Sequence, residues 1–221
     1  MPEQRLKAVI FDFDGVICES VDAKVDAFRR IFADHPEHLS RILEYHIKNG
    51  GISRYEKFKV IYRDILKKEL TAPESKRLGE KFAEYCYQMV VDAPLVKVAG
   101  DFLEQYHRKL MLFVASGTPD DEMKSIVKAK KLQKFFKKIY GSPQSKFEIV
   151  RDIMNGHGLP QDAVVFLGDS INDYEGARQA GIQFIGRVRE GDKNPFSDVR
   201  VEHVVKDVAE FLQWLKTARL L

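Results

Sequence analysis

Asp12 and Asp14 stand two residues apart at the end of an apolar stretch, in the sequence FDFDG. If that stretch is a buried strand, both carboxylates lie at its mouth, where charge is costly unless cations or hydrogen bonds compensate it. A hard divalent ion such as Mg²⁺ is the usual compensation, because it prefers oxygen ligands. The pair therefore predicts a metal site in which one carboxylate can both ligate the ion and attack a substrate.

Two more aspartates follow a second apolar stretch, in the sequence GDSIND. Asp169 and Asp173 would supply further oxygen ligands for the same ion. Asp173 also has an explanation in local structure, because an acidic residue in the first turn of a helix interacts favourably with the helix dipole. Both interpretations of Asp173 stay open.

Residues that could hold a phosphate follow a third apolar stretch. Ser116 offers a hydroxyl and Gly117 an unhindered backbone N–H, which together suit a phosphate oxygen. Thr118 and Pro119 are explained as the N-cap and the first residue of a helix. Lys146 lies where another helix is predicted to begin, and a cation there is unfavourable unless it meets an anion. A solvated side chain is the alternative for this lysine.

These residues follow short apolar runs that do not alternate with polar residues, which predicts strands buried on both faces. Helical patterns between the later runs predict an α/β fold with a Rossmann-like, doubly wound parallel sheet. Ligands bind such a sheet beyond the carboxyl ends of its strands, so the polar residues are expected to converge on one site. The apolar runs are residues 6–11, 110–115, 163–167 and 182–185, and the helical patterns are 121–129, 146–155 and 173–179.

About eighty residues between the first and second runs have a different pattern. Their apolar residues recur every three to four positions, which predicts several short helices and no strand. We expect an all-helical cap domain at residues 17–94, inserted into an α/β core domain formed by residues 1–16 and 95–221. Both junctions could act as hinges.

A loop is predicted inside this helical block. Asn49, Gly50 and Gly51 interrupt the helical pattern. Ser53 and Glu56 then have the spacing of a capping box, which predicts the start of the next helix.

The composition predicts an ordinary folded protein and excludes several other classes. The chain has 221 residues, a net charge of +3 and 44% apolar residues, which argues against disorder and gives no support for nucleic-acid binding. Its two cysteines cannot form a disulfide framework or a four-thiolate zinc site. We find no secretion signal and no apolar run long enough to span a membrane, and therefore expect a cytoplasmic protein.

The motifs together resemble those of the haloacid dehalogenase-like superfamily of phosphohydrolases. Asp12 to Val16 resemble its first motif, Ser116 to Thr118 its second, Lys146 its third, and Gly168 to Asp173 its fourth. They occur in the family's order and at similar spacing over nearly the whole chain. The helical insertion after the first motif resembles the family's small mobile cap of the first type.

The resemblance implies a two-step phosphoryl transfer. Asp12 would attack phosphorus to form an aspartyl phosphate. Asp14 would protonate the leaving oxygen and then activate the water that hydrolyses this intermediate. Mg²⁺ would be held by the Asp12 carboxylate, the Asp14 backbone carbonyl and Asp169, with support from Asp173.

The remaining phosphate oxygens would meet Ser116, the Gly117 N–H and Lys146, by the same resemblance. The loop from Lys48 to Arg54 resembles the cap specificity loop of the β-phosphoglucomutase branch, so Lys48 and Arg54 are candidate substrate contacts. Lys146 lacks the prolines that follow this lysine in many phosphoglycolate phosphatases. The sequence therefore leaves the branch open between these two.

The leading hypothesis is a Mg²⁺-dependent phosphatase that acts on a small phosphorylated metabolite, as a monomer or homodimer, with no nucleic-acid or membrane partner. A phosphomutase of the β-phosphoglucomutase type is the first rival, and a non-catalytic phosphate-binding protein is a weaker one. A phosphonate hydrolase would need a desolvated cap lysine, for which the sequence suggests only Lys48. The lysine-rich stretch at residues 128–138 is interpreted as a solvated helix with an apolar anchor.

Overall fold

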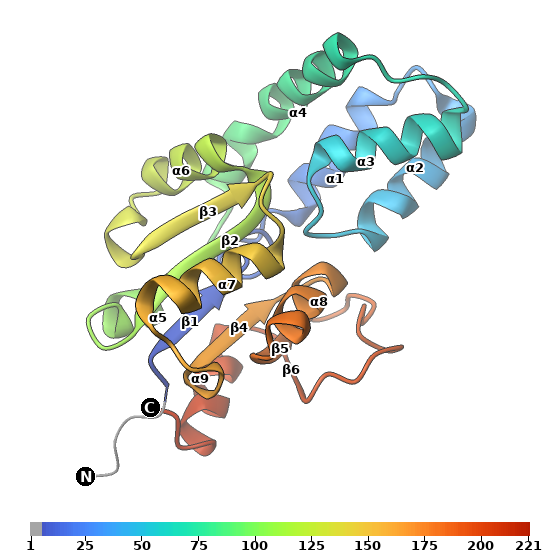
Figure 1. The fold of residues 1–221 in the computed structure, drawn as a ribbon. Helices are drawn as coiled ribbons and strands as arrows, with labels where there is room; N and C mark the ends of the chain where they lie inside the picture. The colour runs from blue at the N-terminus through green and yellow to red at the C-terminus, as the bar shows by residue number, and fades with distance from the viewer. Residues whose placement is uncertain (1–5) are drawn as a thin grey trace.

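The computed structural model describes residues 6–221, and its centre is a six-stranded sheet in which all paired strands are parallel (Figure 1). The strand order is β3-β2-β1-β4-β5-β6. This is the predicted Rossmann-like α/β fold. The strands are β1 (Ala8–Phe11), β2 (Met111–Pro119), β3 (Lys138–Ser142), β4 (Val164–Gly168), β5 (Gln183–Arg187) and β6 (His203–Val205).

The first strand, β1, lies between β2 and β4 and is buried along its whole length. Its side chains alternate between two separate apolar clusters, with Val9 and Phe11 in one and Ala8 and Ile10 in the other. Burial of both faces explains why its sequence is continuously apolar. The strands β3 and β6 were not predicted, since their short sequences are largely polar or exposed.

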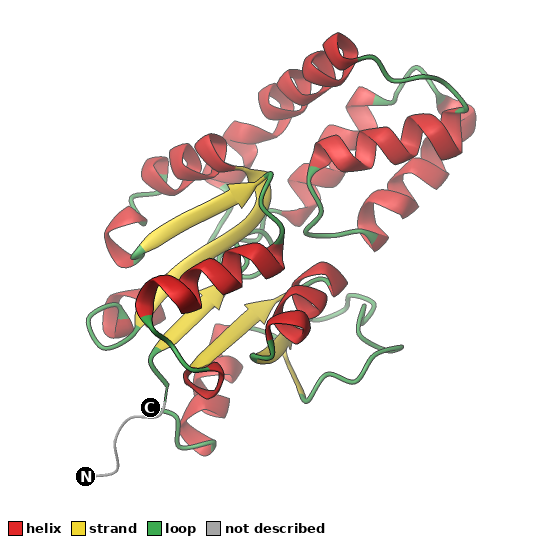
Figure 2. Cartoon of the chain, viewed as in Figure 1, coloured by secondary structure: helices red, strands yellow, loops and turns green. Residues whose placement is uncertain are grey.

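Helices cover both faces of the sheet (Figure 2). Apolar side chains of α5 (Ala99–Tyr106), α6 (Asp120–Ala129) and α9 (Val208–Thr217) join the cluster on one face. Those of α7 (Lys146–His157) and α8 (Ile171–Ala180) join the cluster on the other. Two short 3₁₀ turns, η2 (Gln133–Phe135) and η3 (Gln161–Ala163), precede β3 and β4.

The chain between β1 and β2 contains a block of helices at the carboxyl end of the strands (Figure 1). We call α1 to α4 together with η1 the helical insertion. Packing of α1 on α2 and α4 surrounds buried aromatic rings, among which Phe28 contacts Phe32, Phe58 and Phe82. The elements are α1 (Val21–Ile31), α2 (Pro36–Lys48), α3 (Arg54–Val60), the π-helix η1 (Ile61–Leu66) and α4 (Ala72–Asp92).

Two predictions about helix capping are wrong. Thr118 does not cap a helix, because β2 continues through Pro119 and α6 begins at Asp120. Ser53 precedes α3 without a side-chain capping bond, and Glu56 instead bonds Lys59.

The lysine-rich stretch at residues 128–138 is not one helix, because α6 ends at Ala129 and a 3₁₀ turn leads into β3. Leu132 and Phe135 are buried anchors, which matches the expected apolar contact. Tertiary packing of these anchors under α6 overrides the helical propensity of the lysines. Among the helices of residues 6–221, none has the length and apolar content that a membrane crossing requires.

Candidate active site

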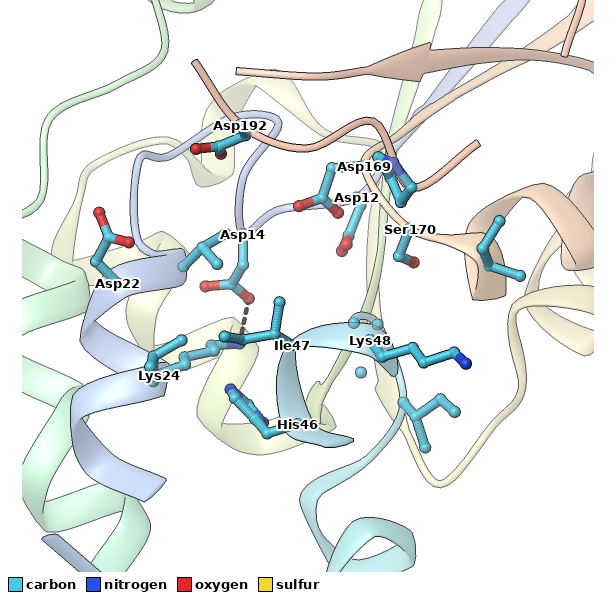
Figure 3. A pocket seen from close by; sticks show the side chains of 18 of the residues that line it. Asp12, Asp14, Asp22, Lys24, His46, Ile47, Lys48, Asp169, Ser170 and Asp192 are labelled. Carbon is cyan, nitrogen blue, oxygen red and sulfur yellow. Dashed lines mark hydrogen bonds and ion pairs between the residues drawn. The ribbon is translucent and has the colours of Figure 1, made fainter. Parts of the chain in front are cut away.

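Three carboxylates meet beyond the ends of the two central strands. Asp12 follows β1, Asp169 follows β4, and Asp173 lies in the first turn of α8. One carboxylate oxygen of each lies within 4.8 Å of the others, and Figure 3 shows Asp12 and Asp169 side by side at the cavity. Burial raises the pKa of Asp12 to about 7, and burial with the Asp12 charge raises the pKa of Asp169 well above its usual value. The cluster therefore favours a cation.

Lys146 supplies one positive charge to this cluster. Its Nζ lies 3.1 Å from Asp12 Oδ1 and 2.6 Å from Asp173 Oδ1, and donates a hydrogen bond to the Ala115 carbonyl at 2.6 Å. Burial lowers the pKa of Lys146, but the two carboxylates outweigh burial and raise it. The lysine is therefore a buried cation in a helix first turn, and the alternative of a solvated side chain is wrong.

For Asp173 the structure confirms the role at the helix start, and the role as a metal ligand stays a prediction. Its Oδ2 accepts hydrogen bonds from the backbone N–H and hydroxyl of Ser170, at 3.1 and 2.6 Å, which closes a capping box at the start of α8. Its Oδ1 faces Lys146. One side chain thus fixes the turn that carries Asp169 and also orients the lysine.

The Asp14 carboxylate lies apart from the group of three. Its Oδ1 accepts a hydrogen bond from the Ser20 hydroxyl at 2.7 Å, and its Oδ2 forms an ion pair with Lys24 of α1 (Figure 3). Lys24 also donates to the Thr118 hydroxyl at 2.7 Å. Burial would raise the pKa of Asp14, but the charge and hydrogen bond of Lys24 outweigh burial and lower it. The helical insertion thus supplies the cation that faces this carboxylate.

Ser116 and Gly117, at the carboxyl half of β2, line the same cavity as Asp12 and Asp14. The Ser116 hydroxyl accepts a hydrogen bond from the Thr118 N–H at 3.1 Å. The loop of the insertion passes directly over Gly117, where an added Cβ would lie 2.3 Å from the Gly51 carbonyl oxygen. Gly51 itself has a φ of +73°, which favours glycine. Both glycines let the two parts of the chain approach closely.

Residues of the first, second and fourth sequence motifs and of the insertion line a cavity of about 370 Å³. Arg54 and Lys48, the two candidate substrate contacts, both line this cavity. Their charged groups have different surroundings. The Arg54 guanidinium is buried and binds Glu122 of α6 at 2.6 Å and the Gly79 carbonyl at 3.3 Å. Lys48 is exposed, and its amine extends away from Asp12 and Asp14 (Figure 3).

The donor set suits a hard divalent ion. Asp12, Asp169 and Asp173 present carboxylate oxygens within reach of one centre, and oxygen ligands are those that Mg²⁺ prefers. Lys146 offsets only part of their charge, as the raised pKa of Asp169 indicates. Among residues 6–221, no ion pair to Asp169 is found within 4.0 Å. A second positive charge beside Asp169 would relieve this crowding.

Comparison with known proteins assigns this arrangement to a family. Residues 9–187 match the family described as haloacid dehalogenase-like hydrolase. The chain belongs to this family. The resemblance predicted from the four motifs is thereby confirmed, and the protein is a hydrolase of the haloacid dehalogenase-like type.

Relatives of this hydrolase carry phosphatase names. It is 24% identical over 185 residues to a phosphorylated carbohydrates phosphatase of Thermotoga maritima, with 81% of this chain and 84% of that protein covered. It is 24% identical over 228 residues to a phosphoglycolate phosphatase of Aliivibrio fischeri, covering 98% and 99%. The fold matches that of a hydrolase from Pseudomonas syringae with a TM-score of 0.78 at 22% identity, covering 96% and 98% of the two chains.

The sequence did not identify two lysines of the insertion that line the cavity of this hydrolase, Lys24 and Lys57. Lys57 is a desolvated lysine of the insertion. Lys48, the candidate that the sequence suggested for a desolvated lysine, is exposed. A signal for Lys57 was available, because it lies three residues after Arg54 and shares a helix face with it. No local pattern marks Lys24, whose partners are 10 and 94 residues away.

Proposed function

We propose that this hydrolase is a Mg²⁺-dependent phosphatase that acts on a small phosphate monoester through an aspartyl-phosphate intermediate. The observation that carries the proposal is the meeting of Asp12 with Lys146 and Asp169 at the carboxyl ends of the central strands, where Asp12 and Asp169 line a cavity. The phosphatase names of two relatives support the same reaction class.

Asp12 is the proposed nucleophile. Its Oδ1 is held by the Phe13 N–H at 2.7 Å and lies 3.1 Å from the Lys146 amine, so the carboxylate is oriented from one side. The other oxygen attacks phosphorus, and the bond from phosphorus to the ester oxygen breaks. The leaving oxygen then needs a proton.

Asp14 is the proposed proton donor and, in the second step, the base that takes a proton from water. Ser20 and Lys24 hold its two oxygens in place. While the Lys24 ion pair is made, the pKa of Asp14 is lowered and the carboxyl group favours the charged form. Acting as an acid therefore requires Lys24 to move from Asp14 or to be shared with substrate.

Ser116 and the Gly117 N–H are proposed to bind phosphate oxygens together with Lys146. Mg²⁺, when bound by Asp12, Asp169 and the Asp14 carbonyl with support from Asp173, would neutralise charge that develops on the transferred phosphoryl group. We further propose that residues 17–94 act as a cap. Closure is supported by the Arg54–Glu122 pair and by a hydrogen bond of 3.1 Å from the Asn172 side chain to the Gly51 carbonyl, which both join the insertion to the core.

The test measures phosphate release from a panel of monoesters with and without Mg²⁺, in the wild-type protein and in Asp12→Asn. We expect Mg²⁺-dependent release by the wild type and a loss of about 10⁴-fold or more in kcat for the variant, as for removal of a nucleophile. Asp12→Asn removes one of three crowded charges, so circular dichroism should show a folded protein.

A hexose 1-phosphate in the same panel separates the rival function. Conversion to the 6-phosphate without phosphate release would assign a phosphomutase instead. Substantial phosphate release by Asp12→Asn, or release that is indifferent to Mg²⁺, would refute the proposed mechanism.

A further inference from the structure

The cavity contains a lysine that the proposed reaction does not use. Lys57 of α3 lines the cavity and is only 3% exposed. Its Nζ lies 3.2 Å from His46 Nδ1 and donates to the His46 carbonyl at 3.1 Å. His46 is stacked on Phe28 at a ring distance of 3.9 Å, which holds this support in place. The two acceptors leave one of the three N–H donors of a charged amine for another partner.

Lys57 differs from the other buried and half-buried cations at or beside this cavity in having no carboxylate partner among residues 6–221. Among residues 6–221, no carboxylate lies within 4.0 Å of its amine, whereas each of the others has one. The pairs are Lys24 with Asp14, Lys146 with Asp12, Arg54 with Glu122, and Arg187 with Glu19.

The charges around Lys57 increase the cost of burying it. Burial, followed by the charge of Lys24, lowers its pKa to about 7, although the carboxylates of Asp169 and Asp14 act in the opposite direction. Burial and the charges of Lys57 and Lys24 also hold the pKa of His46 well below its usual value, so His46 is neutral. A buried amine without a charged partner destabilises the fold unless an anion joins it.

We propose that Lys57 binds a second anionic group of the substrate, a carboxylate or a second phosphate, at the end away from the phosphorus that is attacked. This inference rests on the proposed phosphatase function and names its substrate class as a small phosphate monoester with an anionic tail. Lys57 of the insertion lines the same cavity as Asp12 and Asp169 of the core, so a single molecule can meet both parts. A volume of about 370 Å³ limits that molecule to a small metabolite.

The test uses three phosphate esters whose leaving groups share a three-carbon chain and differ in the group at its far end. Propyl phosphate has a neutral tail, 3-phosphooxypropanoate a carboxylate, and propane-1,3-diyl bisphosphate a second phosphate. We expect the wild type to prefer at least one anionic ester over propyl phosphate in kcat/KM, and the preferred ester tells a carboxylate site from a phosphate site.

Lys57→Met keeps the length of the side chain and removes its charge. We expect the ratio of kcat/KM for the preferred anionic ester over that for propyl phosphate to fall by about 10- to 100-fold, as for loss of a hydrogen bond to a charged group. The control is Lys59→Met, two residues along the same helix, because the Lys59 side chain is 62% exposed and pairs only with Glu56. Its ratio should equal that of the wild type.

A binding measurement makes the result independent of turnover. Calorimetry with 3-phosphonopropanoate, 1,3-propanediphosphonate and propylphosphonate should show the same preference and the same loss in Lys57→Met. Equal preferences in wild type and Lys57→Met, or a wild type that favours the neutral tail, would overturn the inference and leave the phosphatase function intact. Absence of hydrolysis of all three esters would count against the proposed function, and the phosphonate affinities would then still decide the role of Lys57.

Discussion

The two walls of the cavity balance their charges differently. The core wall, formed by strand ends, contains Asp12 and Asp169. Asp173 completes the group of three carboxylates, and Lys146 contacts Asp12 and Asp173. The wall formed by the helical insertion contains Lys57 and His46, and within residues 6–221 no carboxylate lies within 4.0 Å of either side-chain nitrogen. Lys24 connects the walls through Asp14. In the proposals above, the core wall therefore holds the reacting groups, and the insertion wall takes a negative charge from the substrate to compensate Lys57.

The largest effect in this comparison is expected from Lys146→Met, which removes the cation of the core wall. Asp12 and Asp173 would remain buried without their partner, so we expect a loss of about 3 kcal/mol or more in the free energy of unfolding. Loss of a donor to the phosphoryl group should also lower kcat by about 10²-fold or more.

Urea unfolding and steady-state kinetics measure these two effects of Lys146→Met. Lys134→Met is a suitable control, because that lysine is exposed and its contacts are an exposed pair with Glu104 and the ring of Phe135. A Lys146→Met protein as stable and as active as the control would show that the carboxylates do not depend on this amine.

The next effect concerns the metal on the core wall. Mg²⁺ should raise the melting temperature of the wild type, because an ion that binds only the folded state at 100 times its dissociation constant adds about 2.7 kcal/mol. In Asp169→Asn one of the three carboxylate charges is removed, so Mg²⁺ should raise the melting temperature of this variant much less than that of the wild type. Thermal melts of the wild type and of Asp169→Asn, each in EDTA and in Mg²⁺, measure the two increases in melting temperature. An equal gain in the two proteins would place the ion elsewhere.

The smallest effect is expected on the insertion wall, where removing a lysine should raise the free energy of unfolding, whereas removing Lys146 from the core should lower it. Lys57→Met should stabilise the protein by about 1–2 kcal/mol at pH 7, because it removes a buried amine that no carboxylate compensates. The pKa of Lys57 is lowered to about 7 in the folded protein, so the unfolded chain binds more protons between pH 7 and about 10.5. Wild-type stability therefore rises with pH across this window relative to the variant.

Urea titrations of the wild type and Lys57→Met at pH 7 and pH 9.5 test this sign. The advantage of Lys57→Met should be larger at pH 7 than at pH 9.5, and Lys59→Met should show no such change. A destabilised Lys57→Met at both pH values would mean that the amine is a structural contact of His46, and the contrast between the walls would disappear.

The residues of the core wall could be predicted because each follows a feature that is local in the sequence. Asp12 and Asp169 end apolar runs, and runs of this kind form parallel strands whose carboxyl ends share one edge. The predicted capping box at Ser53 and Glu56 is wrong, although the helix does begin at Arg54. Ser53 does not cap α3, whereas Ser145 and Ser170 form capping boxes at α7 and α8. Local spacing alone does not tell which serine has the right backbone geometry.

By itself, the sequence determined the α/β class, the order of the motifs and the group of aspartates, because apolar runs and the polar residues that end them are adjacent in the chain. The desolvation of the lysines that line the cavity follows from the tertiary structure alone. Lys57 is desolvated because His46 of α2 and Phe28 of α1 pack beside it, whereas Lys48 is exposed at the end of α2. Desolvation depends on the whole surroundings of a side chain, and a linear pattern does not contain those surroundings.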